Sequence, residues 1–266
     1  MIALDINGLR VGKKRDIVAL HFASCERFGT LRPMPQPAQR KAAAVARRST
    51  KAPAVSDRDA DATRADILSV ATEEFASKGL SGSRVDEIAE RTHTVKRMIY
   101  YYFGSKEGLY RAVLERAYDH IRTIESTLEL DSLSPMDALR QLVRVTFDYH
   151  NKHPEFVRLV MNENIHKGAH VVGLPNIKER NRTVIATLRH LLDRGVRSGD
   201  FRADIDPIEL HMSISALCFY NVSNRYTFST IFGRDMTSAK AAAARREVIV
   251  EIIEKWCRPE RQSIKS

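Results

Sequence analysis

Helical periodicity is the feature of this sequence that most limits what it can fold into. From Asp57 onward, apolar residues recur at intervals of three and four positions, the spacing of one helix face, and no convincing strand alternation appears. Ile67, Leu68, Ala71 and Phe75 form the first of these faces. The pattern therefore predicts an all-α protein.

Three helices and then a longer one are predicted at the start of the helical region. Gly79 ends the first helix, at a position where a left-handed residue is useful. Ser83 is expected to open the second helix, with Asp86 three residues later as its partner in a weakened capping box. A short turn leads to a third helix over residues 95–103, and Ser105 is expected to cap the fourth.

The third predicted helix puts cations beside tyrosines. Ile99 and Phe103 lie four residues apart, so they share a face that can pack on the other helices. The positions that then point largely outward are Lys96, Arg97, Tyr100 and Tyr101. Tyrosine rings gain little from water, whereas on DNA the cations bind phosphates or guanine edges and the tyrosines contact phosphates and thymine methyl groups. The alternative that stays open is a helix with core tyrosines and merely solvated cations.

The second and third helices have the spacing of a helix-turn-helix, which lays its second helix in the major groove of DNA. Residues 64–110 resemble the DNA-binding domain of the TetR family of bacterial regulators, most plainly in the run VDEIAERTHTVKRMIYYYFGSKEGLY. The resemblance implies a three-helix helix-turn-helix domain, with its motif over Arg84 to Phe103. It also implies a larger helical domain after it, for ligand binding and dimerisation.

The resemblance implies which residues contact DNA. Two positions depart from the family pattern, since His93 replaces the turn glycine and Val95 replaces the serine cap, which leaves Thr94 as the expected cap. The positions implied to face the groove, to contact phosphate or to begin the motif are Arg84, Val85, Thr94, Lys96, Arg97, Met98, Tyr100, Tyr101, Tyr102 and Lys106.

Composition and motif together divide the chain into four segments. Residues 1–56 are rich in Pro, Ala, Ser and cations and are expected to form a disordered basic tail. Their eleven Lys and Arg against three Asp and Glu account for +8 of the formal net charge of +10. The tail is either a non-specific DNA-contacting arm or an extension without a role. The other expected segments are the helix-turn-helix domain at 57–110, the ligand-binding and dimerisation domain at 111–258, and a flexible C-terminus at 259–266.

The expected C-terminal domain contains the run ELHMSISALCFYNVSNRYTF, which has too little polar surface for a helix buried on one side only. The family resemblance implies that the last two long helices pair with those of a second copy. The residues expected at this homodimer interface, several of them one turn apart in a stripe that a monomer would leave in water, are Leu217, Val248, Ile249, Ile252, Ile253 and Trp256.

A small-molecule effector is expected inside the helices of the same domain. Each of its candidate contacts also fits an ordinary core position. The expected apolar liners are Phe147, Met161, Phe219 and Tyr220, and the expected polar contacts are His150, Arg158 and Asn221.

Several classes of function are not indicated. The chain has no GxSxG, Walker, HExxH or dinucleotide-binding motif, so we expect neither an enzyme nor a cofactor. Its three cysteines are far apart, which fits no disulfide framework or zinc motif and is typical of the cytoplasm. No stretch approaches the ~20 apolar residues of a membrane span, so no membrane association is expected.

The sequence thus predicts a cytoplasmic, homodimeric repressor that binds a palindromic operator in double-stranded DNA and is released by a small-molecule effector. One alternative is a helical metal protein or enzyme that uses His150 and His153, with His166 and His170 further along. A second alternative is a protein that coats DNA without sequence preference through its basic tail.

Deletion of residues 1–56 is predicted to preserve specific DNA binding and to lower both non-specific affinity and its salt dependence. Eleven cations in this segment can release counterions from DNA without reading bases. Titrations of specific and random duplexes at several salt concentrations measure this, and an unchanged salt slope would show that the tail does not contact DNA.

Overall fold

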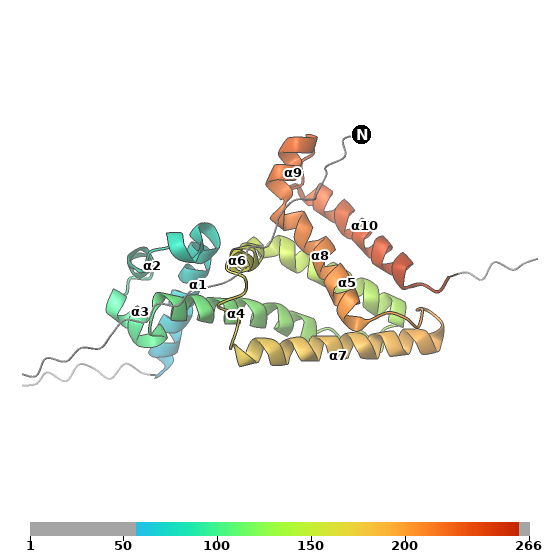
Figure 1. The fold of residues 1–266 in the computed structure, drawn as a ribbon, viewed down its shortest axis with the longest axis horizontal. Coiled ribbons are helices and arrows are strands. Elements are labelled where there is room, and N and C mark those ends of the chain that lie inside the picture. Colours follow the sequence, from blue (N-terminus) through green and yellow to red (C-terminus); the bar gives the residue numbers. More distant parts are fainter. Residues whose placement is uncertain (1–56, 261–266) are drawn as a thin grey trace, which may run out of the picture. The chain divides into compact units, whose positions relative to one another are not determined.

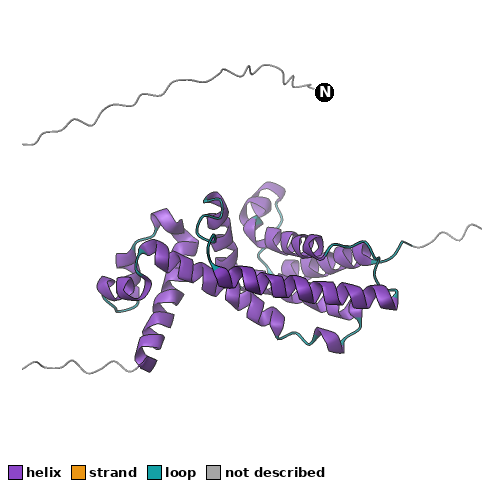
Figure 2. Ribbon diagram, turned by 60° about the horizontal axis from the view of Figure 1, so that its bottom comes forward, coloured by secondary structure: helices purple, strands orange, loops and turns teal. Residues whose placement is uncertain are grey.

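The computed structural model describes residues 57–260, and every regular element in that range is a helix (Figure 2). The predicted basic tail and the last six residues lie outside the described residues. The elements (Figure 1) are α1 (Asp57–Gly82), α2 (Val85–Arg91), α3 (Lys96–Phe103), α4 (Lys106–Ser126), the short 3-10 helix η1 (Leu130–Ser132), α5 (Pro135–Lys152), α6 (Pro154–Ile165), α7 (Pro175–Ser198), α8 (Pro207–Ser223), α9 (Arg225–Phe232) and α10 (Ala239–Cys257). None of these helices combines the length and the apolar character that a bilayer span requires. The all-α prediction is confirmed.

The end of α1 is set by Gly79, as predicted. Its φ of 68° and ψ of 176° lie outside the helical range and kink the helix three residues before its last residue, Gly82. Ser83 is buried, and its hydroxyl donates to the carbonyls of Gly79 and Glu74. The predicted Ser83 cap on the second helix is therefore wrong: α2 begins at Val85, and the residue before it, Arg84, makes no side-chain cap.

Helices α1–α3 share a hydrophobic core with a helix from the second domain. Leu159 of α6 is completely buried in the same cluster as Phe75, Ile88 and Ile99. Beside it, Asn162 Nδ2 donates to the carbonyl oxygen of Phe75 at 3.2 Å. The helix-turn-helix is thus packed directly on α6.

Helix α4 belongs to both domains. It begins with Ser105 as its N-cap, whose hydroxyl accepts from the Gly108 amide at 3.0 Å, as predicted. Figure 1 shows it running from the α1–α3 group toward α7, and it is continuous to Ser126. The predicted boundary between residues 110 and 111 therefore falls inside a helix.

The second core is built from α5, α7, α8 and α10, with Leu139, Val143, Leu191 and Ile214 among its buried residues. Three ion pairs tie α10 to α5, including a two-pronged one in which Arg140 Nε and Nη2 bind the Glu254 carboxylate at 2.8 and 2.9 Å. Arg140 lowers the pKa of Glu254 to about 2. These contacts fix which side of α10 faces its own domain.

That orientation corrects half of the predicted dimer stripe. Ile249 and Ile253 are buried in the core of their own domain, at 0% and 1% exposure. Leu217 and Trp256 are partly buried against the same core. Val248 and Ile252 are exposed at 44% and 42%. Neighbouring residues of a helix point about 100° apart, so the two one-turn pairs in the sequence belong to different faces.

Gly195→Ala is predicted to destabilise the protein, although the same change usually stabilises an exposed helix by about 1 kcal/mol. A Cβ at this position of α7 would lie 1.9 Å from Cδ2 of the buried Phe201 ring. Forcing the ring aside costs about 1–3 kcal/mol by overpacking. Urea denaturation measures the loss, and Gly82→Ala on the exposed end of α1 is the control that should change little. An unchanged or higher midpoint for Gly195→Ala would contradict this packing.

Candidate nucleic-acid interface

Helix α3 presents the predicted cationic and aromatic face to solvent. Its core contact is Ile99, which is completely buried, as predicted. Tyr101 is 77% exposed and Tyr100 38% exposed. Lys96 and Arg97 are exposed beside them, whereas Met98 and Tyr102 are half-buried. The prediction that this face points outward is confirmed, and it excludes the alternative with Tyr100 and Tyr101 in the core.

The turn before α3 has the backbone of a helix-turn-helix. His93 takes φ of 49°, the left-handed conformation expected where the family pattern has glycine. The Thr94 amide donates to the Ala89 carbonyl at 3.1 Å, which closes the turn on α2. The predicted Thr94 cap is wrong, because the N-cap of α3 is the extended residue Val95 and no side chain caps the helix. No side chain therefore binds the first-turn amides of α3, of which the Met98 amide donates to the Val95 carbonyl at 2.8 Å, and helix N-termini of this kind favour phosphate.

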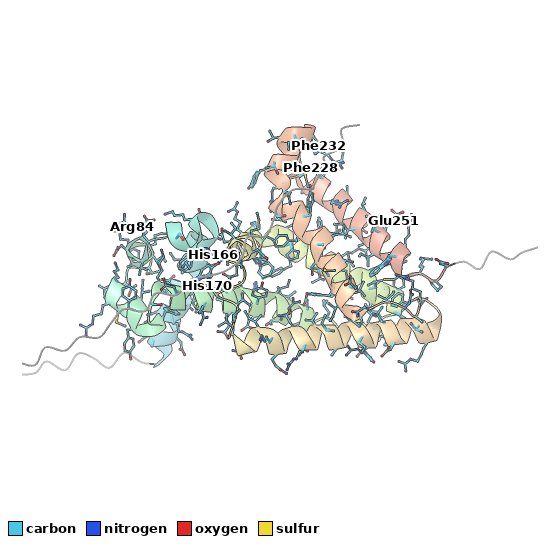
Figure 3. The ribbon with its side chains drawn as sticks, viewed as in Figure 1. Arg84, His166, His170, Phe228, Phe232 and Glu251 are labelled. Atoms are coloured by element: carbon cyan, nitrogen blue, oxygen red, sulfur yellow. The ribbon has the colours of Figure 1, made fainter. Side chains whose placement is uncertain are left out.

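The charged residues around α3 differ in whether they already form an ion pair. Lys96 Nζ lies 3.1 Å from the Asp86 carboxylate of α2, in a pair whose two side chains are about half exposed. Such pairs contribute little to stability, so a DNA phosphate can replace the carboxylate. Arg97 makes no ion pair within the described part of the chain. Arg84 is exposed at the start of α2 and labelled in Figure 3.

One residue implied to contact DNA has a buried side chain. Val85 is only 5% exposed and packs in the core of the DNA-binding helices. Its side chain does not reach the surface, because it supplies the first apolar contact of the short helix α2. Its backbone amide, at the first position of that helix, is the part of Val85 that can approach a phosphate. Lys106, at the start of α4, is half-buried.

The predicted effector contacts do not meet in one place. His150 and Phe219 line a cavity of about 210 Å³. Tyr220 and Asn221 line another of about 380 Å³, beside α9 and α10. The other predicted contacts lie elsewhere. Arg158 and Met161 line a third cavity, and Phe147 is buried in the core. The single predicted pocket is therefore wrong as a set, because long helices carry these residues on different faces.

The 210 Å³ cavity contains polar residues that the sequence reasoning missed. Arg122 and Glu125 of α4 form an ion pair whose side chains are each only 9% exposed, and both line this cavity. With Tyr118 and Ile121 they repeat at three- and four-residue intervals, so one helix face carries all four. That spacing was the available signal, since it places a charged pair on an otherwise apolar face.

Two histidines line the same cavity, His150, which is buried, and His211, which is half-buried. The pKa of His150 is lowered to about 4, mainly by burial and then by the positive charge of Arg122 and by His211. The pKa of His211 is also lowered to about 4, by burial and then by Arg122. Both imidazoles are therefore neutral at neutral pH.

The histidines considered as a metal site are separated by the fold. His150 stacks on Phe156, with ring centroids 5.7 Å apart, whereas His153 faces His120 and binds Glu155. His166 and His170 lie together near α6 (Figure 3), 5.5 Å apart between ring centroids. Within residues 57–260, no three His, Cys, Asp or Glu side chains are grouped as a metal site requires.

Comparisons with known proteins agree with this architecture. Residues 67–113 match the family described as bacterial regulatory proteins of the tetR family, and residues 135–253 match the tetracyclin repressor-like C-terminal domain. The HTH-type transcriptional repressor NicS of Pseudomonas putida is 37% identical over 194 residues, which cover 73% of this chain and 92% of NicS. The HTH-type transcriptional repressor SCO4008 of Streptomyces coelicolor is 34% identical over 144 residues, covering 52% of this chain and 69% of that protein.

A solved structure supports the same assignment. The crystal structure of SCO4942 from Streptomyces coelicolor, described as a transcriptional regulator, aligns with a TM-score of 0.57 and 29% identity over 74% of this chain and 99% of that one. The sequence match to NicS extends over both domains, and the exposed face of α3 lies inside the matched DNA-binding segment. This chain therefore belongs to the tetR family of bacterial transcriptional regulators.

Proposed function

We propose that this protein is a cytoplasmic repressor that binds a palindromic DNA operator as a homodimer and is released by a small-molecule effector. The observation that carries the proposal is the outward face of α3. Two cations and two tyrosines are exposed on this face, and a buried isoleucine packs the opposite face of the helix on the core. NicS and SCO4008, both named as transcriptional repressors, support repression over activation.

The dimer is proposed to form through an apolar surface on α8 and α10. On α8, four residues separate Ile208 from Met212 and eight separate Met212 from Tyr220, and all three are 46–58% exposed. On α10, Val248 and Ile252 continue the surface, and Val248 lines the same cavity as Tyr220. Contiguous exposed apolar residues of this extent are typical of an interface. Two copies related by a two-fold axis would bury them as four helices.

Helix α4 is the proposed connection between effector and DNA. It starts directly after the recognition helix and carries Arg122 about 24 Å further along, at 1.5 Å per residue. A ligand that moves this end of α4 changes the position of α3 relative to its copy in the dimer. A coupling free energy of about 1–3 kcal/mol is typical of such regulation.

Arg97→Ala and Tyr100→Ala are predicted to weaken operator binding without loss of folding or assembly. If Arg97 contacts a base edge, its removal should cost about 1–3 kcal/mol and relax sequence preference. Fluorescence anisotropy with operator and shuffled duplexes measures both effects. Arg182→Ala on α7, which removes an equal charge from a 79% exposed side chain, is the matched control. Wild-type affinity in both α3 variants would place the DNA-binding surface elsewhere.

Val248→Asp combined with Ile252→Asp is predicted to give folded monomers that lose specific DNA binding. Both side chains are exposed on one copy, so charges there oppose association and leave the core intact. Light scattering with circular dichroism measures assembly and folding. Val172→Asp, at a valine that is 67% exposed outside α8 and α10, is the control. A wild-type protein that is monomeric at micromolar concentration would remove both the interface and the palindrome.

A further inference from the structure

The 210 Å³ cavity has an aromatic side built around His150. The imidazole lies parallel to the Phe156 ring, at 13° and 5.7 Å between centroids, and Phe219 meets it edge-on at 6.0 Å. All three side chains line the cavity. Flat, apolar surfaces in this arrangement favour a flat ring over a chain or a globular group.

The same cavity is lined by Arg122, whose guanidinium has a hydrogen-bond donor without a partner among the described residues. The side chain of Arg122 is more than nine-tenths buried, and its Nη1 binds Glu125. Its Nε has no hydrogen-bond partner among the described residues, and neither has Nδ1 of the buried His150. Both side chains line the cavity. Buried polar atoms are almost always satisfied in folded proteins, so side chains with unused hydrogen-bonding capacity beside a cavity favour a ligand that supplies polar atoms.

The surroundings favour a negative charge on what enters. Burial lowers the pKa of both His150 and His211, and the charge of Arg122 lowers each further, which places both imidazoles within reach of that charge. Among the described residues, Glu125 is the one carboxylate that lines the cavity, and it is already paired with Arg122. A cation would meet the same repulsion as the imidazoles, whereas a carboxylate matches the planar fork of a guanidinium.

We propose that this cavity binds a small carboxylic acid built on a single flat ring, with its carboxylate on the guanidinium N–H groups of Arg122 that Glu125 leaves free. An apolar cavity of about 150 Å³ holds benzene, so a space of about 210 Å³ accepts one ring and a carboxylate. The inference rests on the proposed function, because it names the chemical class of the effector.

A neighbouring cavity provides an internal control. About 260 Å³ in volume, it lies on α4 and α7, shares Arg122 and Glu125 with the first, and has a second arginine, Arg180, in its lining. Arg180 Nε binds the Asp119 carboxylate at 2.8 Å. Substitutions of Arg122 and of Arg180 therefore show on which side of the Arg122–Glu125 ion pair an acid binds.

The test is calorimetric titration of the DNA-free protein with benzoate, and with benzamide as a neutral probe of the same shape. Wild type should bind benzoate and should bind benzamide at least about tenfold more weakly, since the charge-assisted hydrogen bonds are lost. The double variant Arg122→Gln with Glu125→Gln removes both charges, so no unpaired charge stays buried. It should lose about ten- to a hundredfold in benzoate affinity while benzamide affinity changes little.

Glu125→Gln alone should change affinity in the opposite direction. It keeps Arg122 and removes the competing carboxylate, so benzoate should bind more tightly than to wild type. A purely structural role of the ion pair would instead weaken both probes in every variant. Arg180→Gln should leave benzoate affinity as in wild type.

The proposal is overturned if wild type does not bind benzoate at millimolar concentration, if benzamide binds equally well, or if Arg180→Gln weakens binding and the double variant does not. A separate measurement of operator binding, with and without benzoate, keeps the two proposals apart. Benzoate binding by a protein that fails to recognise any operator would remove the proposed function and leave the carboxylate site. Specific operator binding by a protein that ignores benzoate would do the reverse.

Discussion

The burial of Leu159 in the core of the DNA-binding helices is the contact on which the rest of the structure depends. This α6 residue has no exposed surface and fills space in the cluster that contains Phe75 and Ile88. Truncating such a leucine typically costs about 2–5 kcal/mol, so the helix-turn-helix does not have a complete core of its own. On the same helix, Phe156, about one turn before Leu159, and Val160, the next residue, line the cavity near Arg122. A single helix thus separates the candidate effector site from the DNA-binding core.

Much of the DNA-binding domain could be predicted from the sequence, because its determinants are local. The left-handed residues Gly79 and His93, the Ser105 cap and the buried Ile99 each depend on neighbours within a few positions. The two failures there are also local: Ser83 donates its hydrogen bonds backward to α1, and Val95 leaves α3 without a side-chain cap. In both cases the backbone geometry took precedence over a favourable residue type.

The candidate effector site could not be predicted in the same way, because it is formed by residues from five helices. His150 and Phe219 were identified as neighbours of one cavity, yet Arg158 and Tyr220 look equally suitable in sequence and line other spaces. Which face of α10 is buried likewise depends on its ion pairs to α5, more than a hundred residues earlier for Arg140 and Glu254. Periodicity gives the spacing of a face but not its partner.

The ion pair of Arg122 and Glu125 is difficult to explain by stability alone. Burying two charges carries a desolvation penalty that their attraction often fails to exceed, and well-packed apolar residues are frequently as stable. Burial raises the pKa of Glu125 while Arg122 opposes that rise, so the carboxylate is under opposing influences. A charged pair that divides two cavities, with unused donors on one partner, is better explained by binding than by folding.

The continuity of α4 has a geometric consequence for regulation. A hydrogen-bonded helix resists bending, so a displacement near Arg122 is transmitted as rotation of a rod about its packing contacts. Over about 24 Å, a tilt of about 5° moves the far end by about 2 Å. Two-fold symmetry in the proposed dimer doubles the change in separation, against half-sites spaced about 34 Å apart. A tilt of this size in the proposed dimer would take the two recognition helices out of step with one turn of DNA.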